Sequence, residues 1–262
     1  MTLDFTGFKD EAAKLLNVNL DGYKLKRVKR RTESLMRRYD IDDYDQCLRK
    51  LKNDVEFRAA YLDHFTINTS EFFRNPKSFS HLREKILPQL FANFSERIKI
   101  WSAPCSNGCE PYTIAIILTE MGIDSSRYSI LASDLDPEIL QVAKEGVYGT
   151  NSLKSVPSEI MEKYFTPLDQ DKDKYQLSSE IMSKVKFEEK DLINDRFSSG
   201  WHLILSRNFF IYLTKELKAQ LTQKFVDVLK PEGYFFLGNT EFIFNPGKYN
   251  LDKTHFSFYQ KG

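Results

Sequence analysis

Two acidic residues stand where a nucleotide-binding protein would normally bind its ligand. Glu110 lies in the segment WSAPCSNGCEPYT, residues 101–113, which follows a β-forming run, and Asp134 ends the next β-forming run. When strands and helices alternate, a carboxylate at the end of the second strand can accept hydrogen bonds from both hydroxyls of a ribose. Asp134 comes 26 residues after Gly108, so we expect it to hold a nucleoside.

The loop itself excludes the common phosphate-binding patterns. A dinucleotide loop needs three glycines and a triphosphate loop needs a lysine after its glycines, whereas this loop has only Gly108. Glu110 places a negative charge at the mouth, where it should repel phosphate and attract a cation. S-adenosylmethionine fits, because it carries a ribose, an ammonium and a sulfonium but no phosphate. The alternative is that Glu110 only stabilises the first turn of its helix.

Two other stretches combine polar and aromatic residues. TINTSEFFR, residues 66–74, places Asn68, Ser70 and Arg74 around two phenylalanines, which we interpret as packing residues rather than an adenine platform. SRNFFIY, residues 206–212, lies at the end of a predicted strand and so should lie at the ligand edge. Its Tyr212 is either a site residue or an ordinary core tyrosine.

The elements that must position these residues alternate from residue 97 onward. Strand-like and helix-like segments succeed one another, with a proline and a glycine bounding several helices. This order predicts a parallel sheet with helices on both faces, a doubly wound α/β domain. A polar stretch between Gly146 and Lys184 is too long for a simple connection and predicts an inserted β-hairpin subdomain. The predicted strands are 97–104, 127–136, 184–192, 201–208 and 233–241, and the helices are 110–122, 136–146 and 214–230.

The first seventy-five residues predict a compact helical module. Its segment KLKRVKRRTESLMRR, residues 24–38, has eight basic residues and one acid. Helical spacing aligns four of them in a stripe opposite an apolar face. The stripe is either a solvated surface or a docking site for nucleic-acid phosphates or an acidic protein helix. Its members are Lys24, Arg27, Arg31 and Arg38.

Composition limits the alternatives. The chain has 262 residues, of which 41% are hydrophobic, and its net charge is +1, so no strong overall field draws it to nucleic acid or to anionic lipid. The sequence contains no run of eighteen consecutive apolar residues, so it predicts no membrane-spanning helix. Three cysteines do not make a disulfide framework and are typical of a reducing compartment, which indicates a cytoplasmic protein. Scattered histidines predict no metal site.

The chain closely resembles the CheR family of chemotaxis-receptor glutamate O-methyltransferases. The resemblance rests on TINTSEFFR, WSAPCSNGCEPYTIAI, ASDLDPEIL, SRNFFIYL and LKPEGYFFLGNTE, which occur in the family's order. It implies a helical domain over residues 1–75 and a Rossmann-type methyltransferase domain over 76–262, with a small antiparallel β-subdomain inserted at about 150–185. It also implies that the basic stripe docks the receptor's glutamate-bearing helical bundle, with S-adenosylmethionine as cofactor and no metal.

The resemblance further implies the site residues. Arg74 and Tyr212 would lie nearest the transferred methyl group. The cofactor contacts would fall on Asn68, Ser70, Arg74, Glu110, Asp134, Asp191, Leu192, Arg207 and Asn208.

The charges of the reaction agree with these residues. A glutamate side chain, with a pKa of about 4.3, is already a nucleophile near neutral pH and requires no general base. We expect Arg74 to orient this carboxylate and Tyr212 to position the sulfonium end. Two other function classes stay open: a nucleic-acid methyltransferase and a non-catalytic module that binds the cofactor. A monomer without membrane insertion is expected.

Overall fold

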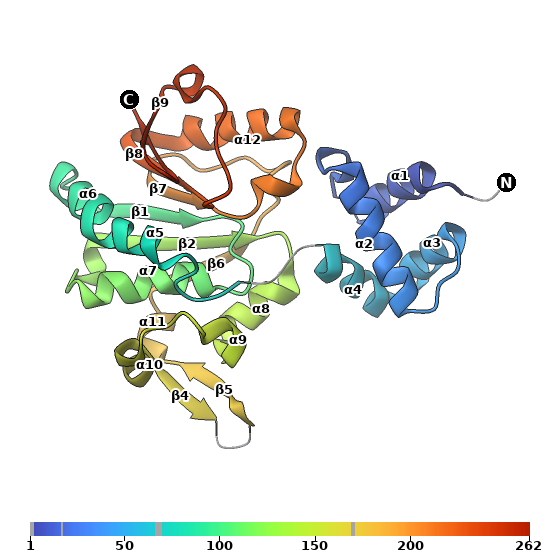
Figure 1. Ribbon diagram of the computed structural model, residues 1–262, viewed down its shortest axis with the longest axis horizontal. Helices are drawn as coiled ribbons and strands as arrows, with labels where there is room; N and C mark the ends of the chain where they lie inside the picture. The colour runs from blue at the N-terminus through green and yellow to red at the C-terminus, as the bar shows by residue number, and fades with distance from the viewer. Residues whose placement is uncertain (1–2, 17, 66–69, 169–170) are drawn as a thin grey trace. The chain divides into compact units, whose positions relative to one another are not determined.

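The computed structural model describes residues 3–16, 18–65, 70–168 and 171–262 and divides the chain into two compact units (Figure 1). The first unit comprises Met1–Asn68 together with Tyr212–Ala219, and the second comprises Thr69–Ile211 with Gln220–Gly262. The first unit therefore takes a short segment from late in the chain, which the sequence boundary at residue 75 does not include.

The first unit is helical. Its helices bury apolar residues at the spacing seen in the sequence, among them Phe8, Val28, Leu35 and Leu51. Two of its helices are separated by Asp54 alone, whose Oδ1 atom accepts a hydrogen bond from the Phe57 amide at 2.9 Å. The elements are α1 (Phe5–Leu16), a 3₁₀ turn (Leu20–Gly22), α2 (Leu25–Arg38), α3 (Tyr44–Asn53) and α4 (Val55–Phe65).

The late segment pairs with the start of α2. Tyr23 and Leu213 form an isolated antiparallel bridge, and Leu213 is fully buried. Gly22 has no room for a side chain, because a Cβ atom there would lie 2.2 Å from the Leu217 side chain. Asn19 caps the 3₁₀ turn before α2 by accepting from the Gly22 amide at 3.0 Å.

The second unit is built on a seven-stranded sheet in the order β6-β2-β1-β7-β8-β10-β9. The first five strands in this order are parallel, as expected for a doubly wound domain, and β10 is antiparallel to both of its neighbours. The strands are β1 (Ile98–Ser102), β2 (Tyr128–Asp134), β6 (Val185–Glu189), β7 (Trp201–Ser206), β8 (Leu229–Leu237), β9 (Leu251–His255) and β10 (Phe258–Lys261).

Helices cover both faces of this sheet. Successive residues of a strand point to opposite sides, so each strand packs against helices on both. Ile100 and Phe236 belong to the large core cluster under α7 (Cys109–Glu120). Their neighbours Trp101 and Phe235 pack instead against Phe225 of α12 (Lys215–Val228), with ring centroids 5.5 and 5.3 Å apart. The predicted two-faced architecture is confirmed. The other long helices of this unit are the continuous α5 (Pro76–His81), π-helical turn (Leu82–Ile86) and α6 (Leu87–Asn93), and α8 (Pro137–Glu145).

The predicted insertion is a three-stranded antiparallel sheet in the order β3-β5-β4, of which Figure 1 labels β4 and β5. The expected hairpin is formed by β4 (Phe165–Leu168) and β5 (Asp171–Leu177). Its third strand, β3 (Val147–Gly149), directly follows Gly146, which ends α8 with a φ of +66°. Short helices flank these strands: α9 (Thr150–Leu153), α10 (Ser158–Tyr164) and α11 (Ser179–Met182).

The C-terminal edge differs from the sequence prediction. The strand predicted over 233–241 ends at Leu237, because the Gly238 amide turns to bond the Glu241 carboxylate at 2.7 Å. The antiparallel pair β9 and β10 was not predicted. Across the described ranges, no helix is long and apolar enough to cross a membrane.

Candidate functional site

The order of strands in the second unit reverses at its centre. From β1 the chain adds β2 and β6 on one side, then β7 and β8 on the other. Ligands of open α/β sheets bind at the carboxyl ends of the strands where this reversal occurs. The loops that leave β1 and β7 meet there, since Ser102 pairs with Leu205. The segments that the sequence singles out, 102–110 and 206–211, therefore lie at the switch point.

Asp134 ends β2 beside the loop that leaves β1. Only 4% of the residue is exposed, and burial raises the pKa of its carboxyl to about 6. Its Oδ2 atom accepts from the Ser106 amide at 2.7 Å and its Oδ1 atom accepts from the Asp136 amide at 3.2 Å. These amides fix the carboxylate in one orientation while leaving a lone pair on each oxygen for a ligand.

Ser106 adds a buried hydroxyl beside this carboxylate. Its backbone is left-handed, with a φ of +51°, and its Oγ atom is buried without a hydrogen-bond partner. Buried polar atoms in proteins are normally paired, so an unpaired one calls for an explanation such as a ligand or a bound water. A ribose bound at Asp134 would supply such a partner, and the residues here fit a nucleoside.

Glu110 is buried and ion-paired. Its Oε2 atom lies 3.0 Å from Nη1 of Arg207, and its Oε1 atom accepts from the Ser102 hydroxyl at 2.8 Å. The side chains of Arg207 and Glu110 are only 2% and 11% exposed. Two residues that the resemblance assigns to the cofactor are thus brought together. The negative charge that the sequence indicates at the mouth is therefore balanced by a guanidinium.

The same guanidinium also holds the segment that carries Arg74. Nη2 of Arg207 donates to the backbone oxygen of Arg74 at 2.8 Å and to the Asn75 side chain at 2.9 Å. It lies over the rings of Phe79 and Phe236, at 4.9 and 4.7 Å from their centroids. Arg207 therefore connects the end of β7, the start of α7 and the start of α5.

The segment before Arg74 is anchored by its two phenylalanines. Phe72 is fully buried, with its ring edge-on to those of Tyr148 and Phe165 at 4.8 and 5.0 Å. The amide of Phe73 donates to the Thr113 hydroxyl of α7 at 3.0 Å. Their interpretation as packing residues is confirmed. The half-buried Ser70 accepts on its backbone oxygen from the Ser152 hydroxyl at 3.4 Å.

Asn68, also predicted to contact the cofactor, lies outside the described residues.

Asp191 and Leu192 form a turn after β6. The carboxylate of Asp191 accepts from the amides of Ile193 and Asn194, at 2.7 and 3.2 Å. The ammonium of Lys224, on α12, donates to the backbone oxygens of three turn residues at 2.9–3.0 Å. Leu192 is 5% exposed. The turn is thus fixed from both sides, and its acceptors are used by the protein itself. The three residues whose oxygens bind Lys224 are Leu192, Ile193 and Asp195.

Asn208 is held by Glu241, a residue that the sequence interpretation did not include in the site. Its backbone is left-handed at a φ of +60°, and its amide donates to Oε2 of Glu241 at 2.7 Å. Glu241 also accepts from the amides of Ile211 and Gly238, at 3.1 and 2.7 Å. Burial raises the pKa of this carboxyl, while its three N–H donors act in the opposite direction. The sequence signal is an acid at the last position of a predicted strand.

Tyr212 belongs to the first unit, whereas Arg74 belongs to the second. The guanidinium of Arg27 lies 4.2 Å from the centroid of the Tyr212 ring, and the Lys24 amide donates to the Tyr212 backbone oxygen at 3.0 Å. Tyr212 is half-buried. Two residues of the basic stripe are thus in contact with Tyr212.

The basic stripe lies beside the apolar face of α2 rather than opposite it. Arg27 and Arg31 are half-buried, and Nε of Arg31 donates to the backbone oxygen of His64. At 100° per residue, the stripe lies about a sixth of a turn from buried Val28 and Leu35. Of the predicted docking residues, Lys24 and Arg38 are exposed. The side of α2 opposite its apolar face carries Lys26, Arg30 and Arg37, all exposed.

Comparison with known proteins decides the family. Residues 68–257 match the model of the CheR methyltransferase SAM-binding domain, and residues 3–66 match that of the CheR methyltransferase all-alpha domain. The chain belongs to the CheR methyltransferase family. It is 33% identical to a chemotaxis protein methyltransferase of Listeria innocua, over 98% of this chain and 97% of the relative. It is 31% identical to one of Borreliella burgdorferi, over 97% and 94% respectively.

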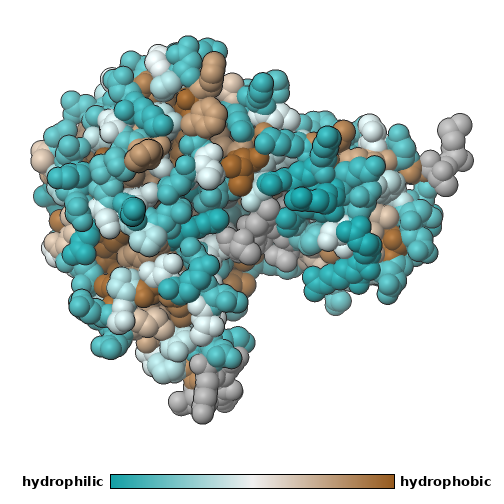
Figure 2. All heavy atoms as spheres, in the orientation of Figure 1, coloured by the Kyte–Doolittle hydropathy of each residue, from teal (hydrophilic) through white to brown (hydrophobic). Residues whose placement is uncertain are grey.

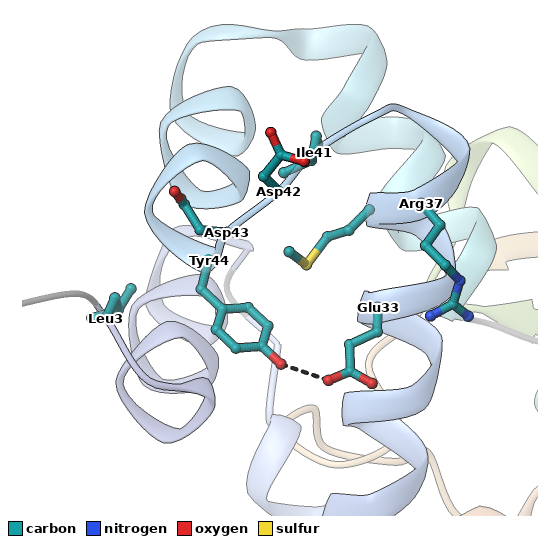
Figure 3. Close-up of a pocket in the computed structure, with 8 residues that line it drawn as sticks. Leu3, Glu33, Arg37, Ile41, Asp42, Asp43 and Tyr44 are labelled. Carbon is teal, nitrogen blue, oxygen red and sulfur yellow. Dashed lines mark hydrogen bonds between the residues drawn. The ribbon is translucent and has the colours of Figure 1, made fainter.

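This CheR-family chain also has a surface pocket in its helical unit (Figure 3). The pocket has a volume of about 380 Å³. The Tyr44 hydroxyl donates to Glu33 at 2.9 Å across it. None of the predicted site residues lines it. Its lining residues are Leu3, Glu33, Met36, Arg37, Ile41, Asp42, Asp43 and Tyr44.

Across the part of the chain that the structure describes, no three His, Cys, Asp or Glu side chains are grouped so as to hold a metal ion. Cys47, Cys105 and Cys109 are all free and buried. Burial raises the pKa of the Cys47 thiol to about 12 and raises that of Cys105 as well, so neither is a reactive thiolate near neutral pH.

Proposed function

We propose that this protein transfers a methyl group from S-adenosylmethionine to glutamate side chains of chemotaxis receptors. The products are glutamyl methyl esters, used for sensory adaptation, and S-adenosylhomocysteine. Membership of the CheR family supports this proposal, as do relatives named chemotaxis protein methyltransferases. The protein would act as a cytoplasmic monomer, without a metal, on the receptor's helical bundle.

The observation that carries the proposal is the fixed carboxylate of Asp134 at the switch point of the sheet. Two backbone amides orient it, and the buried Ser106 hydroxyl beside it lacks a partner. A ribose with two adjacent hydroxyls matches this arrangement. Glu110, neutralised by Arg207, would offer its remaining lone pairs to an ammonium group without creating a strongly negative pocket.

The other predicted residues complete the cofactor site. Leu192 would pack against the adenine, and the Asp191 turn, fixed by its own hydrogen bonds, would hold Leu192 in place. Asn208, held by Glu241, would contact the methionine part of the cofactor together with Ser70. Asn68 is carried over from the family resemblance.

Methyl transfer requires the protein mainly to align the cofactor's methyl group with the attacking carboxylate. The cofactor, when bound, supplies a methyl group on a sulfonium that a nucleophile can displace. The attacking glutamate is ionised near neutral pH, so no general base is needed. Arg74 would orient the incoming carboxylate, because a guanidinium binds a carboxylate through two parallel hydrogen bonds. Tyr212 would help to position the sulfonium end.

Exclusion of water should favour this reaction, because the charges of carboxylate and sulfonium both disappear as the ester forms. An arginine near a cationic cofactor is costly by itself, and an anionic acceptor offsets that cost. A carboxylate acceptor therefore suits the site better than an amine. The basic stripe on α2, with Lys24 and Arg38 exposed and Arg27 and Arg31 half-buried, would dock an acidic receptor helix.

One assay tests the proposal against its alternatives. The protein is incubated with methyl-labelled cofactor and either a receptor cytoplasmic fragment or DNA. We expect base-labile label on the receptor, since carboxyl esters hydrolyse in base, and none with the Asp134→Ala variant. An exposed-residue control, Asp124→Ala, should retain full transfer. Label on DNA would indicate a nucleic-acid methyltransferase, and cofactor binding without transfer would indicate a binding module.

A further inference from the structure

Three phenylalanines of the second unit are exposed to solvent. Phe242 is 67% exposed, Phe244 is 85% exposed and Phe256 is 80% exposed. Large aromatic side chains are seldom left this open in pairs or clusters unless they bind something. Phe242 and Phe244 lie in the loop after β8, and Phe256 lies in the turn between β9 and β10.

All three lie at the same edge of the sheet as the candidate site. Strand β10 runs antiparallel to β8, with Phe258 opposite Phe236, so the turn before β10 lies at the carboxyl end of β8. The Leu237 amide donates to the backbone oxygen of Ser257 at 2.8 Å, and the Ser257 hydroxyl bonds the Asn239 side chain at 3.1 Å. The turn and the loop after β8 are thereby joined.

The loop that carries two of them is held from inside. Burial alternates along it: Glu241 and Ile243 are 5% and 8% exposed, while their neighbours Phe242 and Phe244 point outward. Glu241 bonds the amide of Asn208, and the Ile243 amide donates to the Tyr259 hydroxyl at 3.1 Å. The two aromatic rings are therefore presented on a fixed backbone that is directly bonded to the candidate site.

The absence of charge in these segments indicates which class of partner they can bind. Residues 242–246, FIFNP, and residues 256–258, FSF, contain no charged side chain. Nucleic-acid surfaces select lysine and arginine to neutralise phosphates, so these segments suit an apolar protein surface. Figure 2 shows brown, apolar side chains interrupting the hydrophilic surface in the upper part of the view, where Figure 1 draws β8 and β9.

We propose that Phe242, Phe244 and Phe256 form a docking surface for apolar side chains of the same receptor helix that presents the glutamate. The inference rests on the proposed function and names a second contact for its protein substrate. Adjacent strands lie about 4.8 Å apart, so β10 is roughly 10 Å from β7. That is about two turns of a helix. A helix whose glutamate enters at the end of β7 carries apolar residues of its next turns to these rings.

Such anchors have a definite use in this reaction. A helix held only by one glutamate could turn about its own axis, whereas aromatic contacts along its length fix its rotation and direction. Interfaces concentrate their binding energy in a few aromatic residues that are buried on association. A preformed backbone lowers the entropy lost when they bind. The three rings therefore select a helix with apolar residues at helical spacing from its glutamate.

The test compares exposed-phenylalanine variants with a matched control. The variants are Phe242→Ser with Phe244→Ser, and Phe256→Ser; the control is Val142→Ser, an exposed apolar residue of α8. The substrate is a receptor cytoplasmic fragment. Loss of a buried aromatic anchor costs roughly tenfold in affinity or more. We expect the double variant to raise KM for the receptor about tenfold or more, with an unchanged Kd for S-adenosylmethionine by calorimetry and an unchanged melting temperature.

Different failures have different meanings. If the wild-type protein methylates the receptor and the double variant does so with the same KM, the docking surface is refuted and the proposed function stands. If the wild-type protein methylates no receptor, the proposed function fails and the docking surface fails with it. If the variants lose binding to phosphatidylcholine vesicles while KM for the receptor is unchanged, the rings are a membrane contact and the inference is wrong.

Discussion

Arg207 and Glu110 form an ion pair between the end of β7 and the first turn of α7, with 3.0 Å between Nη1 and Oε2. The two residues are 97 positions apart in the chain. Because both side chains are nearly buried, each charge depends on the other for compensation. The pair thus fixes the two loops between which the ligand is expected to lie.

Removing Arg207 should therefore destabilise the protein. In the Arg207→Met variant the Glu110 carboxylate stays buried with only the Ser102 hydroxyl as partner. Breaking one half of a buried pair typically costs about 3–5 kcal/mol in the free energy of unfolding, which urea denaturation can measure. The control is Lys163→Met, which breaks an ion pair with Glu120 whose lysine is well exposed and should change stability little. Equal effects in both variants would contradict the assigned importance of burial.

Cofactor affinity should depend on the charge of Asp134. Its pKa is about 6 in the folded protein, so the carboxylate gains its charge as pH rises through 6. The ionised form accepts both ribose hydroxyls, whereas the protonated form offers a weaker acceptor. We expect affinity for S-adenosylmethionine, measured by calorimetry from pH 5 to 8, to increase through about pH 6. The Asp134→Asn variant should bind weakly at every pH and lose this dependence.

The same pKa predicts an opposite trend for stability without cofactor. An acid whose pKa rises on folding binds a proton more tightly in the folded state. Its contribution to the free energy of unfolding therefore decreases as pH rises from the unfolded value of 3.8 to about 6. Asp134→Asn should flatten the stability profile in this range, and an unchanged profile would show that burial does not shift this carboxyl.

Arg74 should affect transfer more than cofactor binding. The observed hydrogen bond from Arg207 goes to the backbone oxygen of Arg74, so Arg74→Ala leaves it in place. We expect kcat with a receptor fragment to fall about a hundredfold or more, since misplaced reactants lose the benefit of alignment. The Kd for the cofactor should change little, and exposed Arg127→Ala is the control. Transfer near the wild-type rate would remove Arg74 from the site.

Gly238 should tolerate no side chain. A Cβ atom there would lie 2.6 Å from Oε2 of Glu241 and 3.0 Å from the Asn208 amide. Gly238→Ala must therefore displace the carboxylate that holds Asn208, at a cost of about 1–3 kcal/mol in the free energy of unfolding. Gly247→Ala is the control, since its Cβ meets no atom within 4 Å. Similar melting temperatures for the two variants would show that the loop adapts freely.

Lys224 should position the turn of Asp191 and Leu192. Its ammonium donates to three carbonyl oxygens of that turn and lies 4.3 Å from the centroid of the Phe197 ring. Lys224→Met leaves these oxygens without their donor, so we expect cofactor affinity to fall roughly tenfold. Lys215→Met changes an exposed lysine of the same helix and should have no effect. A Kd that is equal in both variants would exclude Lys224 as a positioning residue.

Local patterns predicted the elements well because their signals lie close together in the chain. Asp136 accepts from the amides of Glu138 and Ile139 at the start of α8, and Gly146 ends that helix in the left-handed region, both as the sequence indicates. Asp134 could be placed at a strand end because apolar residues define β2 up to it. Such capping and periodic signals act over a few residues, and a single sequence displays them directly.

Contacts between distant segments could not be predicted in the same way. Glu241 accepts hydrogen bonds from the amides of Asn208 and Gly238. The local sequence GNTE, residues 238–241, does not indicate that this carboxylate turns inward. The pairing of Glu110 with Arg207 likewise depends on which strands become neighbours. For α2, the sequence grouped Arg27 and Arg31 with the exposed cations, because periodicity alone does not show that each would find a buried partner.

The segment Tyr212–Ala219 gives the first unit two further covalent connections to the rest of the chain. The chain passes between the units after residue 68, after residue 211 and again after residue 219. A graft of the N-terminal helices from a relative would therefore leave Leu213 and Leu217 facing a foreign surface, with Gly22 no longer matched to the side chain that fills the space beside it. Exchange of this unit between family members therefore requires replacing two separated stretches of sequence together. The N-terminal helices alone are not an exchangeable domain.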